Sequence, residues 1–120
     1  MNLRMSLRNS LYYPVGSREA DGGRIVTVRF DESHPIFKGH FPGHPVVPGV
    51  CLVQIAEELL SDQSGHSVRF TAVRNLKFRQ PVTPEMEVTF LLTADDRTVH
   101  VQINDYAQFR ATYMCVDSDL

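Results

Sequence analysis

The chain has 120 residues, the size of one domain, and its 42% hydrophobic and 22% charged content is ordinary for a globular protein. A formal net charge of −2 argues against a general nucleic-acid binder, which would carry a basic excess. No stretch approaches the roughly 18 apolar residues of a membrane span, and the N-terminal residues lack the apolar run of a secretory signal. We therefore predict a single domain over residues 1–120 in the cytoplasm, without a nucleic-acid or membrane partner.

Strand patterns come first along the chain. Residues 11–15 suit a short strand, and Asp21-Gly22-Gly23 turns the chain into a β-branched strand over residues 24–30. Four more strands are predicted at 67–80, 86–93, 98–103 and 106–116. In the first of these four, polar residues alternate with apolar residues that we expect in the core, namely Val68, Phe70, Leu76 and Phe78. The last two strands are expected to join through a two-residue loop, Asn104-Asp105.

One long helix is predicted between these strands, from Gly49 to the break at Ser64-Gly65. Its apolar residues surround most of the helix, so we expect it to be buried. They are Val50, Leu52, Val53, Ile55, Ala56, Leu59 and Leu60. Its polar residues form one stripe, which either opens to a crevice or faces solvent. These are Gln54, Glu57, Glu58 and Ser61.

A helix between one early strand and four later ones, joined mostly by tight turns, predicts an α+β fold in which an antiparallel sheet wraps around one helix. Such a sheet leaves an edge strand free, and free edges are commonly capped by a second copy, so we expect a dimer. Cys51 and Cys115 lie in apolar segments without metal-type spacing, and we predict that both are reduced core thiols.

The segment that enters the helix is the most specific part of the sequence. It reads Gly-His-Phe-Pro-Gly-His-Pro-Val-Val-Pro-Gly-Val from Gly39 to Val50, and Arg-Asn-Leu-Lys-Phe-Arg-Gln-Pro-Val-Thr-Pro follows from Arg74 to Pro84. Together these runs resemble the hot-dog-fold 3-hydroxyacyl-acyl carrier protein dehydratases of fatty acid synthesis. The resemblance implies a hot-dog fold, an acidic acyl carrier protein that bears the substrate, and a dimer with two sites at its interface. In that family each site takes a histidine from one subunit and a carboxylate from the helix of the other.

Dehydration of a 3-hydroxyacyl thioester needs a base for the proton beside the carbonyl and an acid for the departing hydroxyl. His40 suits the base, since imidazole titrates near neutrality, and prolines in its loop hold it in a stiff segment. The free N–H groups expected around Gly49 and Val50, at the N-terminus of the helix, would polarise the thioester carbonyl. With Phe41 and Pro48, these two residues form the predicted substrate-binding set. No cofactor is expected.

The acid position departs from the family. The resemblance places its carboxylate fourteen residues after the histidine, where this chain has Gln54, and an amide cannot deliver a proton. Glu58, one turn later, stands where many family members have glutamine, so it is a candidate substitute acid. The same residue also suits a charge at a crevice mouth or a partner contact. Glu57 is a weaker candidate.

Two further patterns involve histidines and basic residues. His34, His40 and His44 crowd one segment, but the prolines between them prevent a helical metal-ligand spacing, so we predict no metal site. His44 is expected at the pocket rim. A basic strip suits the docking of an acidic carrier protein or is a solvated strand face. It comprises Lys38, Arg69, Arg74, Lys77 and Arg79.

The sequence is compatible with three functions. The first is a dehydratase in which His40 works alone or with help from Glu58 or an ordered water. The second is a catalytically impaired acyl-binding subunit, which in a heterodimer would pair His40 with the partner's carboxylate. The third is a thioesterase on the same fold. The acyl chain length, the pathway, the proton donor, the activity of the chain alone and the choice between homodimer and heterodimer stay open.

Overall fold

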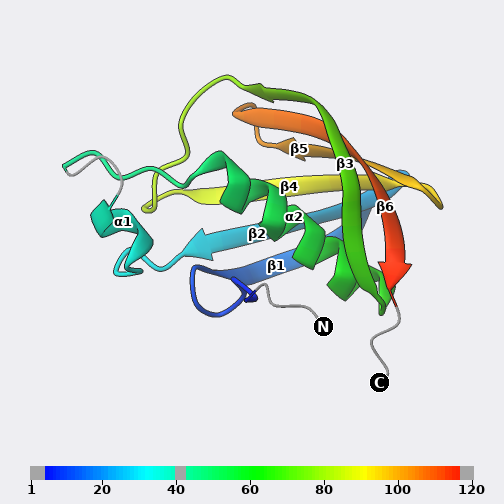
Figure 1. The fold of residues 1–120 in the computed structure, drawn as a ribbon, viewed down its shortest axis with the longest axis horizontal. Coiled ribbons are helices and arrows are strands. Elements are labelled where there is room, and N and C mark those ends of the chain that lie inside the picture. Colours follow the sequence, from blue (N-terminus) through cyan, green and yellow to red (C-terminus); the bar gives the residue numbers. More distant parts are fainter. Residues whose placement is uncertain (1–4, 40–42, 117–120) are drawn as a thin grey trace.

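The computed structural model describes residues 5–39 and 43–116, and an antiparallel sheet in it curves around one long helix (Figure 1). The sheet has the strand order β1-β2-β4-β5-β6-β3. Its strands are β1 (Tyr12–Ala20), β2 (Gly23–Phe30), β3 (Ser67–Phe78), β4 (Glu87–Ala94), β5 (Thr98–Ile103) and β6 (Ala107–Val116). The helices are α1 (Ile36–Gly39), which the sequence did not predict, and α2 (Gly49–Ser64). The predicted α+β fold with one central helix is confirmed.

The ends of α2 follow from local chemistry. Pro48 caps the N-terminus with φ −59° and ψ 143°, and its carbonyl accepts the first helical bonds from Cys51 N at 2.9 Å and Leu52 N at 3.2 Å. At the other end Gly65 adopts a left-handed φ of 76°, and its N–H donates to the Ser61 carbonyl at 3.0 Å. Glycine takes this conformation without steric cost, so the helix ends there.

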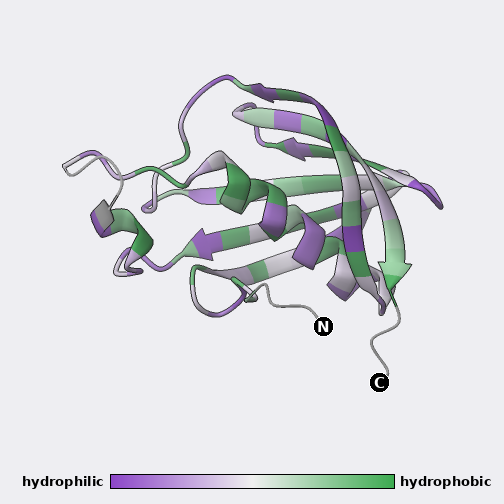
Figure 2. Cartoon of the chain, viewed as in Figure 1, coloured by the Kyte–Doolittle hydropathy of each residue, from purple (hydrophilic) through white to green (hydrophobic). Residues whose placement is uncertain are grey.

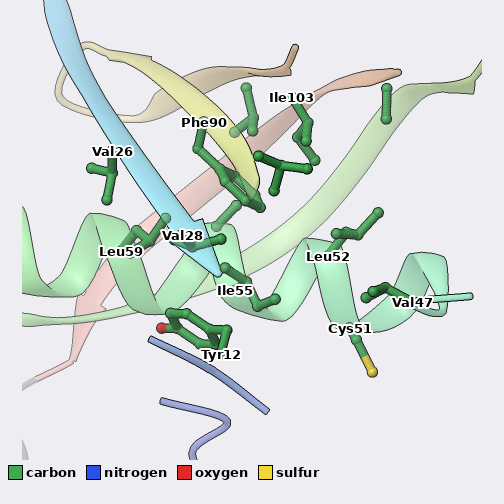
Figure 3. Packing of buried hydrophobic residues seen from close by; sticks show 14 of the residues in the cluster. Tyr12, Val26, Val28, Val47, Cys51, Leu52, Ile55, Leu59, Phe90 and Ile103 are labelled. Carbon is green, nitrogen blue, oxygen red and sulfur yellow. The ribbon is translucent and has the colours of Figure 1, made fainter. Parts of the chain in front are cut away.

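The core lies between α2 and the concave face of the sheet (Figure 3). From the helix, Leu52, Ile55 and Leu59 are buried against Val28 and Phe90 of the sheet. The expectation that the apolar residues of α2 are buried all round is wrong at Val50, which is 75% exposed. Val50 stands four residues before Gln54 and seven before Glu57, so it continues the polar stripe rather than the core face.

The hairpins match the turn signals with two differences. β1 is longer than predicted and pairs with β2 through the two-residue turn Asp21-Gly22, where Gly22 has φ 72°. The loop between β5 and β6 has three residues rather than two, because Ile103 pairs with Ala107. Asn104 takes φ 46° in this loop, a conformation that asparagine tolerates better than most residues.

β3 forms one edge of the sheet, and its apolar side chains are less buried than the sequence predicts. Val68 is buried as predicted, but Leu76 and Phe78 are 45% and 50% exposed, so their assignment to the core is wrong in the single chain. No strand lies beyond β3 in the described sheet, and Asn75, at φ 58°, interrupts its register with β6. Cys115 of β6 is also exposed, whereas Cys51 is buried as expected.

Apolar and polar residues alternate along the sheet strands, as the sequence pattern predicted (Figure 2). Within residues 5–39 and 43–116, neither helix is long and apolar enough to cross a membrane.

Candidate active site

The polar stripe of α2 hydrogen-bonds to backbone on two sides. Toward β3, Ser61 Oγ accepts from Val68 N at 2.9 Å, and Glu57 Oε2 accepts from Phe70 N at 2.7 Å. Glu57 is only 3% exposed, so its carboxylate is part of the buried contact between α2 and the start of β3. This contact gives Glu57 a place in the fold that the sequence did not reveal.

Glu58 faces the N-terminal segment, here residues 5–12, and its carboxylate is surrounded by donors. Oε2 accepts from Leu7 N at 2.9 Å and from Gln54 Nε2 at 2.9 Å. Oε1 accepts from Tyr12 OH at 3.0 Å, Arg8 N at 3.1 Å and Ser6 Oγ at 3.3 Å. With five donors around its two oxygens, this carboxylate acts here as an acceptor only.

Tyr12 and Arg8 strengthen this attachment. Burial, followed by the Glu58 carboxylate beside it, raises the pKa of Tyr12 above its usual range, so its hydroxyl stays protonated and donates. The Arg8 side chain makes an ion pair with Asp62, one turn beyond Glu58 on α2. Glu58 therefore holds the N-terminal segment on the helix, an arrangement that opposes its use as a substitute acid.

Gln54 lies between the same two elements. Its Nε2 donates to the Met5 carbonyl at 2.8 Å and to Glu58 Oε2 at 2.9 Å. The side chain also borders a small cavity of about 130 Å³ between α2, the N-terminal segment and β3. Its lining includes Met5, Gln54, Glu57, Glu58, Ser61 and Arg69. Of the two alternatives for the polar stripe, the structure thus shows a crevice, although a small one.

A larger, mainly apolar cavity of about 320 Å³ lies at the N-terminus of α2. Gly49 borders it, and a Cβ on Gly49 would lie 2.5 Å from the ring of Phe78, so the absent side chain lets that ring rest on the first turn. The lining is Val46, Val47, Gly49, Leu52, Phe78, Arg79, Gln80, Pro81 and Val82. Pro48 is half-buried and Val50 is exposed beside it.

Two predicted site residues, His40 and Phe41, lie outside the described residues, so their placement relative to Gln54 stays a prediction. His44 is exposed, and His34 Nδ1 accepts from Ile36 N at 3.1 Å at the start of α1. Among residues 5–39 and 43–116, no group of three His, Cys, Asp or Glu side chains is arranged to hold a metal ion.

Sequence reasoning missed the attachment of the N-terminal segment to Glu58. Most of the donors are backbone N–H groups or small hydroxyls of a segment without periodicity, and such groups leave no pattern in a sequence. The only usable signal was Tyr12, whose phenol needs a hydrogen-bond partner when its ring is buried.

The helix wrapped by an antiparallel sheet defines a hot-dog protein, and solved structures of low identity share this fold. The dehydratase heterocomplex ApeI:P from Xenorhabdus doucetiae superposes with a TM-score of 0.71 at 18% identity, covering 86% of this chain and 96% of that one. The PaaI protein of E. coli, from the phenylacetic acid degradation operon, gives 0.54 at 14% identity, covering 88% and 79%.

The sequence matches the ApeI-like family, described as ApeI dehydratase, over residues 17–114. The chain therefore belongs to the ApeI-like dehydratase family.

Curated relatives point the same way. The 3-hydroxyacyl-[acyl-carrier-protein] dehydratase FabZ of Acidiphilium cryptum is 42% identical over 69 residues, covering 50% of this chain and 41% of that protein. The FabZ of Campylobacter curvus is 28% identical over 99 residues, covering 72% and 67%. The matched part of this chain spans about half or less of the full length of several FabZ relatives.

Proposed function

We propose that this protein acts on 3-hydroxyacyl thioesters carried by an acyl carrier protein and eliminates water to give the trans-2-enoyl product, in the cytoplasm, as one domain. The observation that carries the proposal is the family match together with an apolar cavity that opens at the N-terminus of α2. The mainly apolar lining suits an acyl chain, and in this proposal fatty acid or related acyl-chain synthesis supplies the substrate.

In this proposal His40 removes the proton next to the thioester carbonyl. The N–H groups of Gly49 and Val50, which make no hydrogen bond among the described residues, stabilise the negative charge on the carbonyl oxygen. Phe41, Pro48 and Val50 contact the substrate around this point. Gln54 occupies the family's acid position without being an acid, so the chain lacks one of the two groups that speed the reaction.

A second function is favoured by the environment of Glu58. Because its carboxylate is occupied by five donors, the chain has no evident proton donor of its own among the described residues. A related hot-dog subunit that contributes a carboxylate would complete the site, with this chain as the acyl-binding partner that supplies His40. A thioesterase would need a carboxylate free to activate water. The three carboxylates of α2 already have partners: Glu57 accepts from Phe70 N, Glu58 accepts from five donors, and Asp62 pairs with Arg8.

The carrier protein is proposed to dock on the predicted basic strip. The register places Arg74 of β3 directly opposite Arg110 of β6, and Arg110 opposite His100 of β5, so these side chains share one face of the sheet. Neither arginine makes an ion pair among the described residues. An acidic partner surface complements such a strip.

Turnover of a 3-hydroxyacyl carrier-protein thioester by the purified chain tests the proposal. We expect His40→Ala to abolish the reaction and His44→Ala, the matched control in the same loop, to leave most of it. The KM for the carrier-bound substrate should rise with ionic strength if docking is electrostatic. Equal loss in both variants argues for a site built on both histidines. Binding of the thioester without turnover favours the partner-subunit function.

A further inference from the structure

The hydrogen bonds of the Gln54 amide decide what this position offers to a ligand. An amide nitrogen carries two hydrogens, and Gln54 Nε2 has two acceptors, the Met5 carbonyl at 2.8 Å and Glu58 Oε2 at 2.9 Å. The nitrogen therefore has no hydrogen left for a substrate. No donor among the described residues contacts the other amide atom, Oε1.

The opposite orientation of the amide is chemically unfavourable. Rotating it by half a turn places Oε1 within about 3 Å of two acceptors, one of which is a carboxylate, and leaves three oxygens without a hydrogen between them. A backbone carbonyl oxygen and a carboxylate oxygen both accept hydrogen bonds and do not donate them. The orientation is thus set by the positions of two acceptors, Glu58 Oε2 and the Met5 carbonyl.

Glu58 is itself held by donors other than Gln54, at both of its oxygens. Leu7 N, Arg8 N and Tyr12 OH donate to it, and these groups belong to the N-terminal segment that also supplies the Met5 carbonyl. One short segment therefore positions both acceptors of the Gln54 amide. Replacing the Glu58 carboxylate by a neutral group weakens this acceptor and the attachment of the segment.

We propose that Gln54 is an oriented hydrogen-bond acceptor for the 3-hydroxyl of the acyl thioester, and that Glu58 and the N-terminal segment are positioning groups that keep its oxygen available. This inference rests on the proposed function, in which Gln54 occupies the position of the group that acts on the 3-hydroxyl. A carboxylic acid there donates to the departing hydroxyl, whereas Gln54 accepts from it. The hydrogen bond runs in the opposite direction and selects ligands that carry a donor at this carbon.

Such an acceptor distinguishes ligands by the substituent on the third carbon of the acyl chain. A 3-hydroxyl donates to Gln54 Oε1, a saturated chain offers nothing, and a 3-oxo group brings a second acceptor against the first. The order of affinity should be 3-hydroxyacyl, then saturated acyl, then 3-oxoacyl. We expect the first step to be about two- to tenfold, the usual net effect of one hydrogen bond.

Calorimetric titration of the full chain with three pantetheine amides of equal chain length tests this, since an amide in place of the thioester prevents turnover. Gln54→Leu should bind the hydroxylated and saturated ligands equally. Glu58→Gln should also reduce the preference, because two amides permit either orientation. Asp62→Asn is the matched control: it removes the ion pair of Arg8 with α2 but leaves both acceptors of Gln54, so the preference should persist.

Each result has a distinct meaning. Equal affinity of the wild-type chain for all three ligands overturns the acceptor role while leaving acyl binding intact. A preference that survives in Gln54→Leu overturns it as well, since another group must then contact the hydroxyl. Binding of none of the three ligands overturns the proposed function together with this inference. Thermal unfolding of Gln54→Leu, a substitution that removes no core contact, confirms that its binding is measured on folded protein.

Discussion

Gln54 and Glu58 show how the meaning of a residue depends on what holds it. From the sequence, Gln54 was a missing acid and Glu58 a nearby carboxylate able to replace it. In the structure the Gln54 amide donates to the Glu58 carboxylate, which accepts hydrogen bonds from five donors in total. The identity of the two residues was readable from their spacing to His40, but their hydrogen bonds depend on a segment that only folding brings alongside α2.

Restoring the acid therefore requires two changes. Gln54→Glu alone places a carboxyl group against the Met5 carbonyl and Glu58, so its pKa rises and its proton is shared with these acceptors instead of the substrate. Adding Glu58→Gln supplies an amide that donates to the new carboxyl. We expect the double variant to dehydrate 3-hydroxyacyl thioesters at least about tenfold faster than wild type, and Gln54→Glu alone to gain less.

The rate of enoyl formation, followed by its ultraviolet absorbance, measures this difference. Glu58→Gln alone is the control, because it contains the second change without the acid, and it should not exceed the wild-type rate. If Gln54→Glu alone is as fast as the double variant, the hydrogen bonds around Glu58 do not restrain position 54. Positions 54 and 58 are then not coupled.

At the scale of elements, the sequence predicted those segments whose ends carry their own signals. Gly65 ends α2 and Gly22 turns β1 into β2, since both take left-handed conformations that glycine adopts freely. The sequence-based prediction was wrong where the burial of a residue depends on neighbouring elements. The apolar pattern of β3 predicts one buried face over its whole length, but burial of Leu76 and Phe78 needs something beyond the edge of the sheet.

The turn between β4 and β5 gives a prediction for stability against pH. Asp95 accepts from Arg97 N at 2.8 Å, Thr98 N at 2.7 Å and Thr98 Oγ1 at 3.0 Å, and these hydrogen bonds lower its pKa below the ordinary value. Because the folded-state pKa is the lower one, Asp95 stabilises the fold above the unfolded-state pKa, near 4, and this contribution is lost as the pH falls through the folded-state value.

Asp95→Asn should consequently cost stability at neutral pH and progressively less as the solution is acidified toward about pH 3. Urea unfolding at several pH values measures the change in the free energy of unfolding. Asp96→Asn is the matched control, since the Asp96 side chain makes no hydrogen bond among the described residues, and its effect should be small at every pH. If the loss of unfolding free energy in Asp95→Asn stays constant with pH, the charge of Asp95 does not contribute to the stabilisation.

At the scale of the whole molecule, the sheet ends on both sides in strands with exposed apolar residues. β3 exposes Val73, Leu76 and Phe78, while β1 exposes Tyr13 and Val15. An unpaired strand edge with apolar side chains favours pairing with another chain, and β3 is the longer of the two edges, with 12 residues against 9. We predict that two copies associate through β3, which would also cover the residues that the sequence assigned to the core.

Val73 and Val15 allow a matched test of this dimer, because both are valines on edge strands and are 40% and 47% exposed. Light scattering at micromolar concentration should give twice the chain mass of 13.6 kDa for the wild type. Val73→Lys places a charge on the β3 edge, where pairing with a second copy brings two such charges close together, so we expect a monomer. Val15→Lys should remain a dimer. The reverse result assigns the contact to β1, and a monomeric wild type means that the exposed face of β3 is covered by a different subunit or by none.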